Sequence, residues 1–235
     1  MFPGHPWQGE PFGEAEYEWF LSRSYEAGVL FEVNMEPFVA FCKSGGHQAN
    51  RLVMKVCTRL SSQRLPQYLL ALNGRPYPAR YPAGYVRQPR PDSDMLEHVA
   101  VREKDEGFSE RLVRAHWKKV PLWFAHKHPR IGTMLARFFP GEEVKDNYAL
   151  MVTRNPLRKL NTRVIVVGSH VRTMALAIPF GKKVFCSFYF PHAFGNINFF
   201  EPFLLGFKTW MEDPEQIPAE LLNKPYREVP TAPAP

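Results

Sequence analysis

Residues 184–196 read VFCSFYFPHAFGN, and this stretch decides the class of fold. Its first seven residues are mostly branched or aromatic, which predicts a β-strand of a buried sheet. The strand runs directly into Pro191 and His192, and Asn196 follows four residues after the histidine. A histidine located directly after a rigid strand can be held as a neutral imidazole in one tautomer, and it can then take a proton from an attacking group. His192 is therefore a candidate general base.

Composition and cysteine usage indicate the class of protein. The chain has 235 residues, of which 45% are hydrophobic and 23% are charged, as is typical of a globular protein with a sizeable core. Cys42, Cys57 and Cys186 lack the paired spacing of a disulfide framework or a zinc site, so we expect no metal and a reducing, cytoplasmic location. The N-terminus does not resemble a secretion signal, and no segment reaches the roughly 20 apolar residues of a membrane-spanning helix.

The order of the predicted elements indicates a mixed layered domain. Residues 73–91 are rich in Pro, Arg and Tyr, which predicts extended segments joined by turns. We expect an irregular arm at 1–18, a single domain at 19–214 and a loosely ordered tail at 215–235. Hydrophobic periodicity predicts helices at 35–43, with Asn34 as N-cap, 48–60 and 199–210, and strands at 28–33, 95–101, 148–153, 164–168, 173–180 and 184–190.

Positive charge is concentrated in one segment. The formal net charge is +7, and a large share of it falls between Glu110 and Phe139. Basic and apolar residues are interleaved there, which predicts a basic amphipathic helical region interrupted at Pro121 and Pro129. A solvated helix face, the phosphates of a nucleotide-like cofactor, an anionic membrane surface and a nucleic acid are the alternatives for its role. No nucleic-acid-binding motif accompanies the segment, so we expect no nucleic-acid partner.

The element order also resembles a known family. Together with Leu65-Pro66-Gln67 and the His192 turn, it is similar to the acyltransferase catalytic domain of 2-oxo acid dehydrogenase complexes, a family that includes chloramphenicol acetyltransferase. The resemblance covers roughly residues 19–214. It implies an α/β, two-layer sandwich in which helices cover a mixed β-sheet. It also implies direct transfer of an acyl group from acyl-CoA, as a cosubstrate, without a permanently bound cofactor.

The resemblance assigns roles to particular residues. His192 matches the histidine of the family motif and is the implied general base, and Asn196 matches an organising Asp or Asn. Thr153 falls at the place of a Ser or Thr hydroxyl that donates to the oxyanion of the tetrahedral intermediate. Asn155 is the alternative donor, and Thr153 is alternatively an ordinary strand threonine. His170 is a further candidate histidine.

The chain departs from the family motif beside the histidine. Ile197 stands where the family has Gly, and Pro191 stands where an Asp often precedes the histidine. Gly195 lies two positions early, which indicates either a shifted turn or a degenerate site. A noncatalytic relative that uses the fold as a binding or interaction module is therefore the alternative function.

The resemblance also implies partners. The N-terminal arm is too short for a lipoyl-bearing or subunit-binding domain, so the expected donor is soluble acyl-CoA and the expected acceptor is a small molecule or a carrier-bound thiol. Candidates for binding the CoA phosphates are Lys118, Lys119, Lys127 and Arg130.

The resemblance implies that one copy of the fold supplies only one wall of a crevice, because the nonribosomal condensation enzymes of the same superfamily use two such folds in one chain. We therefore expect a homotrimer with the sites between neighbouring subunits. The apolar residues expected at this contact are Phe194, Phe199, Phe200 and Phe203, although a core within one chain would use the same residues.

Overall fold

The computed structural model describes residues 26–70, 76–87, 97–113, 148–154, 173–191, 194–195 and 197–229. The helices are α2 (Glu36–Ser44), α3 (Ala49–Arg64), α6 (Ile197–Glu212), the short 3₁₀ helix η3 (Pro214–Gln216) and α7 (Ala219–Asn223). The strands are β1 (Glu26–Val33), β2 (Tyr68–Leu70), β3 (Pro76–Pro78), β4 (Tyr81–Arg87), β5 (Glu97–Lys104), β6 (Gly107–Leu112), β7 (Tyr148–Arg154), β8 (Met174–Ile178), β9 (Val184–Pro191) and β10 (Tyr226–Arg227).

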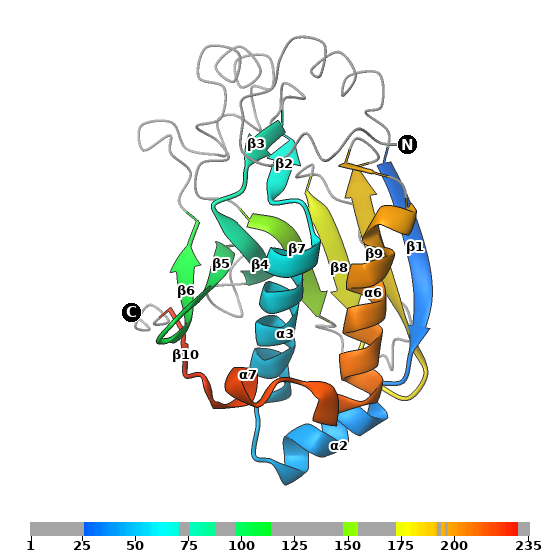
Figure 1. Ribbon diagram of the computed structural model, residues 1–235, viewed down its shortest axis with the longest axis vertical. Coiled ribbons are helices and arrows are strands. Elements are labelled where there is room, and N and C mark those ends of the chain that lie inside the picture. Colours follow the sequence, from blue (N-terminus) through cyan, green and yellow to red (C-terminus); the bar gives the residue numbers. More distant parts are fainter. Residues whose placement is uncertain are drawn as a thin grey trace.

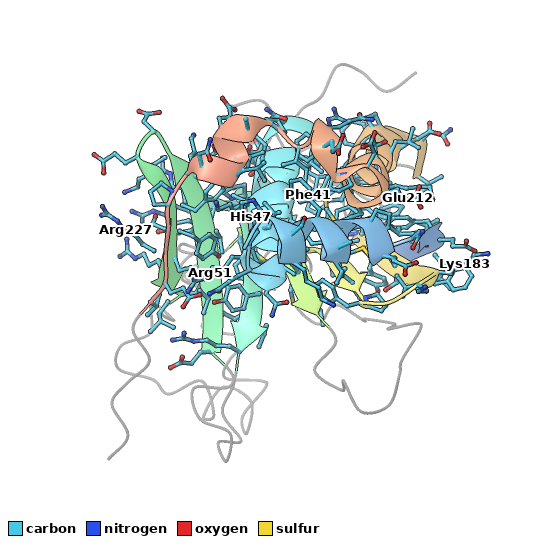
Figure 2. All side chains as sticks on the ribbon, turned by 90° about the horizontal axis from the view of Figure 1, so that it is seen from below. Phe41, His47, Arg51, Lys183, Glu212 and Arg227 are labelled. Carbon is cyan, nitrogen blue, oxygen red and sulfur yellow. The ribbon has the colours of Figure 1, made fainter. Side chains whose placement is uncertain are left out.

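Eight strands form one mixed sheet, in the order β1-β9-β8-β7-β4-β5-β6-β10. Strand β7 pairs in parallel with β8 and β4, and β10 pairs in parallel with β6, whereas the other neighbours are antiparallel. Helices α3 and α6 lie across one face of this sheet (Figure 1). The end-on view confirms that the helices and the sheet form two layers (Figure 2). The expected α/β class, with a mixed sheet covered by helices, is therefore confirmed.

Aromatic packing joins α6 to β9. Phe200, Phe203, Phe207 and Met211 recur at helical spacing, and all four are fully buried. The ring of Phe200 lies 4.4 Å from that of Phe190 and 5.4 Å from that of Phe188, measured between centroids. This cluster fixes α6 against the strand that leads to His192.

The sheet carries a second, smaller apolar cluster on the face opposite to α3 and α6, which we call the second face. Its buried members are Tyr81, Ala100, Tyr148, Met151 and Ala175. Along β7, Leu150 and Val152 belong to the main core, whereas Met151 belongs to this second cluster. Side chains of a strand alternate between the two faces, so odd-numbered residues from Met151 onward lie on the second face.

The elements expected from periodicity largely match the structure where it is described, with differences at their ends. The helix expected at 35–43 is α2, but Met35 rather than Asn34 is its N-cap, and the Asn34 Oδ1 accepts the Glu36 N–H at 3.1 Å. The expected helical region starting at Glu110 is wrong at its first residues, because 110–112 belong to β6 and pair with β5. The strand expected at 164–168, the arm at 1–18 and the remainder of the basic region lie outside the described residues.

The expectation of a loosely ordered tail at 215–235 is wrong for 215–229. Helix α7 packs on α3, and β10 adds a parallel strand to β6. The buried ammonium of Lys55 on α3 donates to the carbonyl oxygens of Leu221, Leu222 and Lys224 at 2.9, 3.2 and 2.6 Å. These are carbonyls at the end of a helix, which have no partner within the helix itself. Lys55 therefore anchors the C-terminal segment to the core.

Replacing Lys55 by methionine is expected to lower the free energy of unfolding by about 2–3 kcal/mol, because three carbonyl groups, in one buried and two part-buried hydrogen bonds, lose a charged donor. The methionine keeps the apolar stem, so the loss reports the ammonium. Urea unfolding measures it, with Lys43→Met, a change at an exposed lysine of α2, as the control. Equal urea midpoints for the two variants would contradict this role of Lys55.

None of the helices within the described ranges is long and apolar enough to cross a membrane.

Candidate functional site

The turn between β9 and α6 contains the central sequence-predicted residues. Pro191 ends β9 and is buried, and α6 begins at Ile197. His192 and Asn196 themselves lie outside the described residues. Strand β9 before them and helix α6 after them are packed together by the aromatic rings of Phe188, Phe190 and Phe200.

Gly195, which lies two positions before the place of the family glycine, has a conformation that only glycine adopts easily. Its φ is +146°, a conformation that favours glycine, and a Cβ built there would lie 3.2 Å from the Cβ and two ring carbons of Phe199. Ile197 is already the first residue of α6 and needs no such conformation. The described part of the turn therefore requires glycine at position 195.

Thr153 lies near the end of β7 and is half-buried. By the alternation along β7, its side chain shares the second face with Met151. Within the described residues its hydroxyl makes no hydrogen bond.

The sheet register separates Thr153 from the end of β9. Thr153 pairs with Ala177, and Ala177 pairs with Ser187. Pro191 lies four residues beyond Ser187 on β9, which is about 13 Å along the strand at about 3.3 Å per residue. Strand β9 is also two strands away from β7 in the sheet, which adds about 10 Å between Thr153 and Pro191 in the perpendicular direction. The ends of β7 and β9 point in opposite directions, as Figure 1 shows. Within one chain, Thr153 and the end of β9 therefore do not meet.

The phenylalanines expected at a subunit contact belong to the core of the chain itself. Phe194, Phe200 and Phe203 are at most 1% exposed, and Phe199 is half-buried against them. The expectation of a contact surface made of these rings is wrong, because the rings pack into the main hydrophobic core of the chain. Among the described residues, the large apolar side chains that are exposed are Leu30 and Leu205 at 54%, Phe185 at 40% and Ile197 at 38%.

These exposed residues lie around the edge strand β1. Leu30 is on β1, Phe185 is on the neighbouring β9, and Ile197 and Leu205 are on α6. A groove between β1 and α6 is lined by Phe31, Ile197, Asn198, Glu201, Leu204, Leu205 and Lys208. Lys208 of α6 donates to the carbonyl oxygen of Glu32 on β1 at 2.7 Å, which links the two elements that form the groove.

A charged cluster joins α3, β5 and the C-terminal segment. Arg59 donates from Nε to Glu103 Oε2 at 2.7 Å, and Lys224 donates to Glu103 Oε1 at 2.7 Å. Burial opposes the ionised form of Glu103, but these hydrogen bonds and charges hold the pKa of its carboxyl below the ordinary value. Arg59 also pairs with Glu220 at 2.6 Å. The charged groups of this cluster pair with one another, and these ion pairs hold the C-terminal segment against α3 and β5.

The four basic residues proposed for CoA phosphates, Lys118, Lys119, Lys127 and Arg130, lie outside the described residues. Asn155 and His170 lie outside them as well.

Across the described ranges, no group of three or more His, Cys, Asp or Glu side chains is placed to hold a metal ion. All three cysteines are buried and none forms a disulfide, and burial raises the pKa of Cys42 to about 11 and that of Cys186 to about 12.

Sequence reasoning missed one polar pair. The Nδ1 of His98 on β5 lies 2.8 Å from the hydroxyl oxygen of Tyr148 on β7, and the two rings are stacked at 6.1 Å. Burial lowers the pKa of His98, which favours the neutral imidazole. The pattern of residues 95–101 predicts the strand but gives no indication of a partner 50 residues away.

Comparison with known proteins gives similarity at the level of three-dimensional structure. No family model and no curated protein matches the chain. A chloramphenicol acetyltransferase is 11% identical, with 84% of this chain and 92% of the other covered and a TM-score of 0.47. The dihydrolipoamide acetyltransferase of Azotobacter vinelandii is 11% identical, with 86% and 87% covered and a TM-score of 0.46. The X-domain from teicoplanin biosynthesis is 10% identical, with 81% and 48% covered and a TM-score of 0.44.

Proposed function

We propose that this protein is a CoA-dependent acyltransferase that moves an acyl group from acyl-CoA directly to a small-molecule or carrier-bound acceptor. The observation that carries the proposal is the half-buried hydroxyl of Thr153 on a rigid strand, which makes no hydrogen bond to another described residue, in a chain whose β9 leads straight into His192. A strand-borne hydroxyl is a suitable donor to a developing oxyanion, because its position is fixed before the reaction. The sequence supplies the imidazole that such a reaction needs.

In the proposed reaction, His192 takes the proton of the acceptor's hydroxyl, amine or thiol as that group attacks the thioester carbonyl. The carbonyl oxygen becomes an oxyanion, to which the Thr153 hydroxyl donates. When the carbon–sulfur bond breaks, the CoA thiolate leaves and takes the proton from the imidazolium. Asn196 orients the turn that carries His192. No covalent intermediate with the enzyme is required.

The separation of Thr153 from the end of β9 leads us to place the site between subunits. A donor at 153 and a base at 192 must both lie within hydrogen-bond reach of one reacting group, about 3 Å each. Because the register holds Thr153 far from Pro191 in the same chain, His192 of one subunit would act with Thr153 of a neighbour. A heterologous contact repeated by three-fold rotation closes into a trimer. The exposed apolar residues around β1 support an interface on that edge.

Charge in the basic region would bind the phosphates of CoA. We expect the double change Lys118→Ala, Lys119→Ala to raise the KM for acyl-CoA, and the increase to shrink as salt is added, because the attraction is electrostatic. Steady-state kinetics at several salt concentrations measure it. Tight binding to duplex DNA at moderate salt, with an unchanged KM for acyl-CoA, would assign these lysines to another partner.

The proposed activity is tested by thiol release from a panel of acyl-CoA esters incubated with hydroxyl, amine and thiol acceptors. Release above that of the His192→Ala protein supports the proposal. If no pair in the panel gives release above this background, the alternative of a noncatalytic binding module with the same fold replaces it. Binding of CoA alone does not distinguish the two, because an inactive relative can retain it.

A further inference from the structure

The hydrogen-bonded pair of His98 and Tyr148 is held in place by the packing of the sheet. Tyr148 is only 1% exposed, and its ring crosses β4 at Gly84. A Cβ at Gly84 would lie 2.2 Å from Tyr148 Cδ1, so only glycine leaves room for the ring there. The tyrosine hydroxyl thereby reaches the His98 Nδ1 at 2.8 Å. Because one ring nitrogen is held by Tyr148, the imidazole has a fixed orientation.

The strand register places His98 of β5 and Thr153 of β7 at matching positions on either side of β4. Val86 pairs with His98, and Gly84 pairs with Met151, so continuing the β4–β7 register by two residues brings Val86 beside Thr153. Val99 and Val101 face the main core and Ala100 faces the second cluster, which puts His98 on the second face with Thr153. The two residues are separated by two strand spacings, about 10 Å, with Val86 between them.

The other ring nitrogen of His98, Nε2, has no hydrogen-bond partner among the described residues, and the side chain is half-buried rather than enclosed. Val86 and Thr153 are half-buried in the same way. These three side chains thus form a row with a polar group at each end and an apolar group in the middle. A small molecule that lies along the row contacts all three.

We propose that His98 binds a hydroxyl group of the acyl acceptor through Nε2, and that Tyr148 is the positioning residue that holds the imidazole. A hydroxyl fits this role because it both donates and accepts, and so matches either tautomer of a neutral imidazole. The acceptor class is therefore a small molecule with an apolar body and a hydroxyl remote from its reacting group. This inference rests on the proposed function, since Thr153 marks where the acyl group reacts.

Kinetics of the His98→Ala protein test the inference. One lost hydrogen bond in a partly dry site is expected to raise the KM for a hydroxyl-bearing acceptor about 10-fold, while the KM for acyl-CoA stays the same. His98→Gln, which keeps a donor and an acceptor, is expected to restore part of the loss. The matched control is His47→Ala, because His47 lies beside Phe41 at the α2 end of the molecule (Figure 2). An unchanged acceptor KM in folded His98→Ala protein overturns the inference.

A spectroscopic measurement separates this inference from the proposed function. Nitrogen-15 NMR of the imidazoles is expected to show His98 in one neutral tautomer, and Tyr148→Phe is expected to mix the tautomers because the holding hydrogen bond is gone. If no acyl-CoA is turned over, propanol and phenol serve as probes, and either is expected to shift the His98 resonances but not those of His47. No shift with either probe, or an unaltered His98 tautomer in Tyr148→Phe, overturns the inference whether or not the protein is an acyltransferase.

Discussion

Replacing His192 by alanine is expected to lower the turnover of acyl-CoA by at least about 10²-fold, because the attacking group loses its general base. The fold is expected to persist, since the packing of β9 and α6 rests on buried rings on either side of the turn. Thiol release under saturating substrates measures the effect. Asn196→Ala is expected to cost less, because it misplaces the imidazole without removing it.

His47→Ala is the control for a general effect of removing a histidine. It is expected to retain full turnover, because His47 stacks on Phe41 beside α2, away from the second face and from the end of β9. Undiminished turnover in a folded His192→Ala protein would remove the assignment of His192 as the base.

The second large effect is expected at Thr153. Thr153→Ala should lower turnover by about 10² to 10³, the usual cost of removing one donor to an oxyanion. Thr153→Ser keeps the hydroxyl and should retain most of the activity. Neither change should alter stability much, because the hydroxyl makes no hydrogen bond within the described part of the fold. Equal losses in the alanine and serine variants would show that the methyl group, through packing, is what matters at this position.

The regular elements were predictable from sequence because each repeats a local pattern. Phe200, Phe203 and Phe207 recur at helical spacing, and the resulting helix is α6. The strand at 184–190 follows from its branched and aromatic residues and corresponds to β9. In both cases the pattern lies within one segment, and hydrophobic periodicity is sufficient to predict the helix or strand.

Features that depend on distant residues were not predictable in this way. The C-terminal segment looked polar and rich in proline, yet Lys55 binds its carbonyl groups across 166 to 169 residues of sequence. The Phe-rich segment beside His192 was equally suited to a subunit contact or to the core, and only the direction of α6 decides for the core. The pair of His98 and Tyr148 needs a glycine on a third strand, and no local pattern links these three positions.

In the candidate site, too, local features were predictable from sequence and long-range ones were not. Thr153 was placed on a strand correctly, and its exposure on the second face is compatible with the proposed role. Its distance from the end of β9 is a property of the strand order and register, which sequence spacing does not give. That distance is the reason for assigning the two ends of the site to different subunits.

Mixing of inactive subunits tests this account most directly. His192→Ala and Thr153→Ala proteins are unfolded together, refolded as a 1:1 mixture and assayed for thiol release, with molar mass followed by light scattering. If each site takes His192 from one subunit and Thr153 from its neighbour, about a quarter of the sites in randomly mixed trimers contain both intact residues, and activity returns to about that fraction of the unaltered protein. A mixture that stays as inactive as its two components, or an unaltered protein that is a fully active monomer, would contradict the shared site.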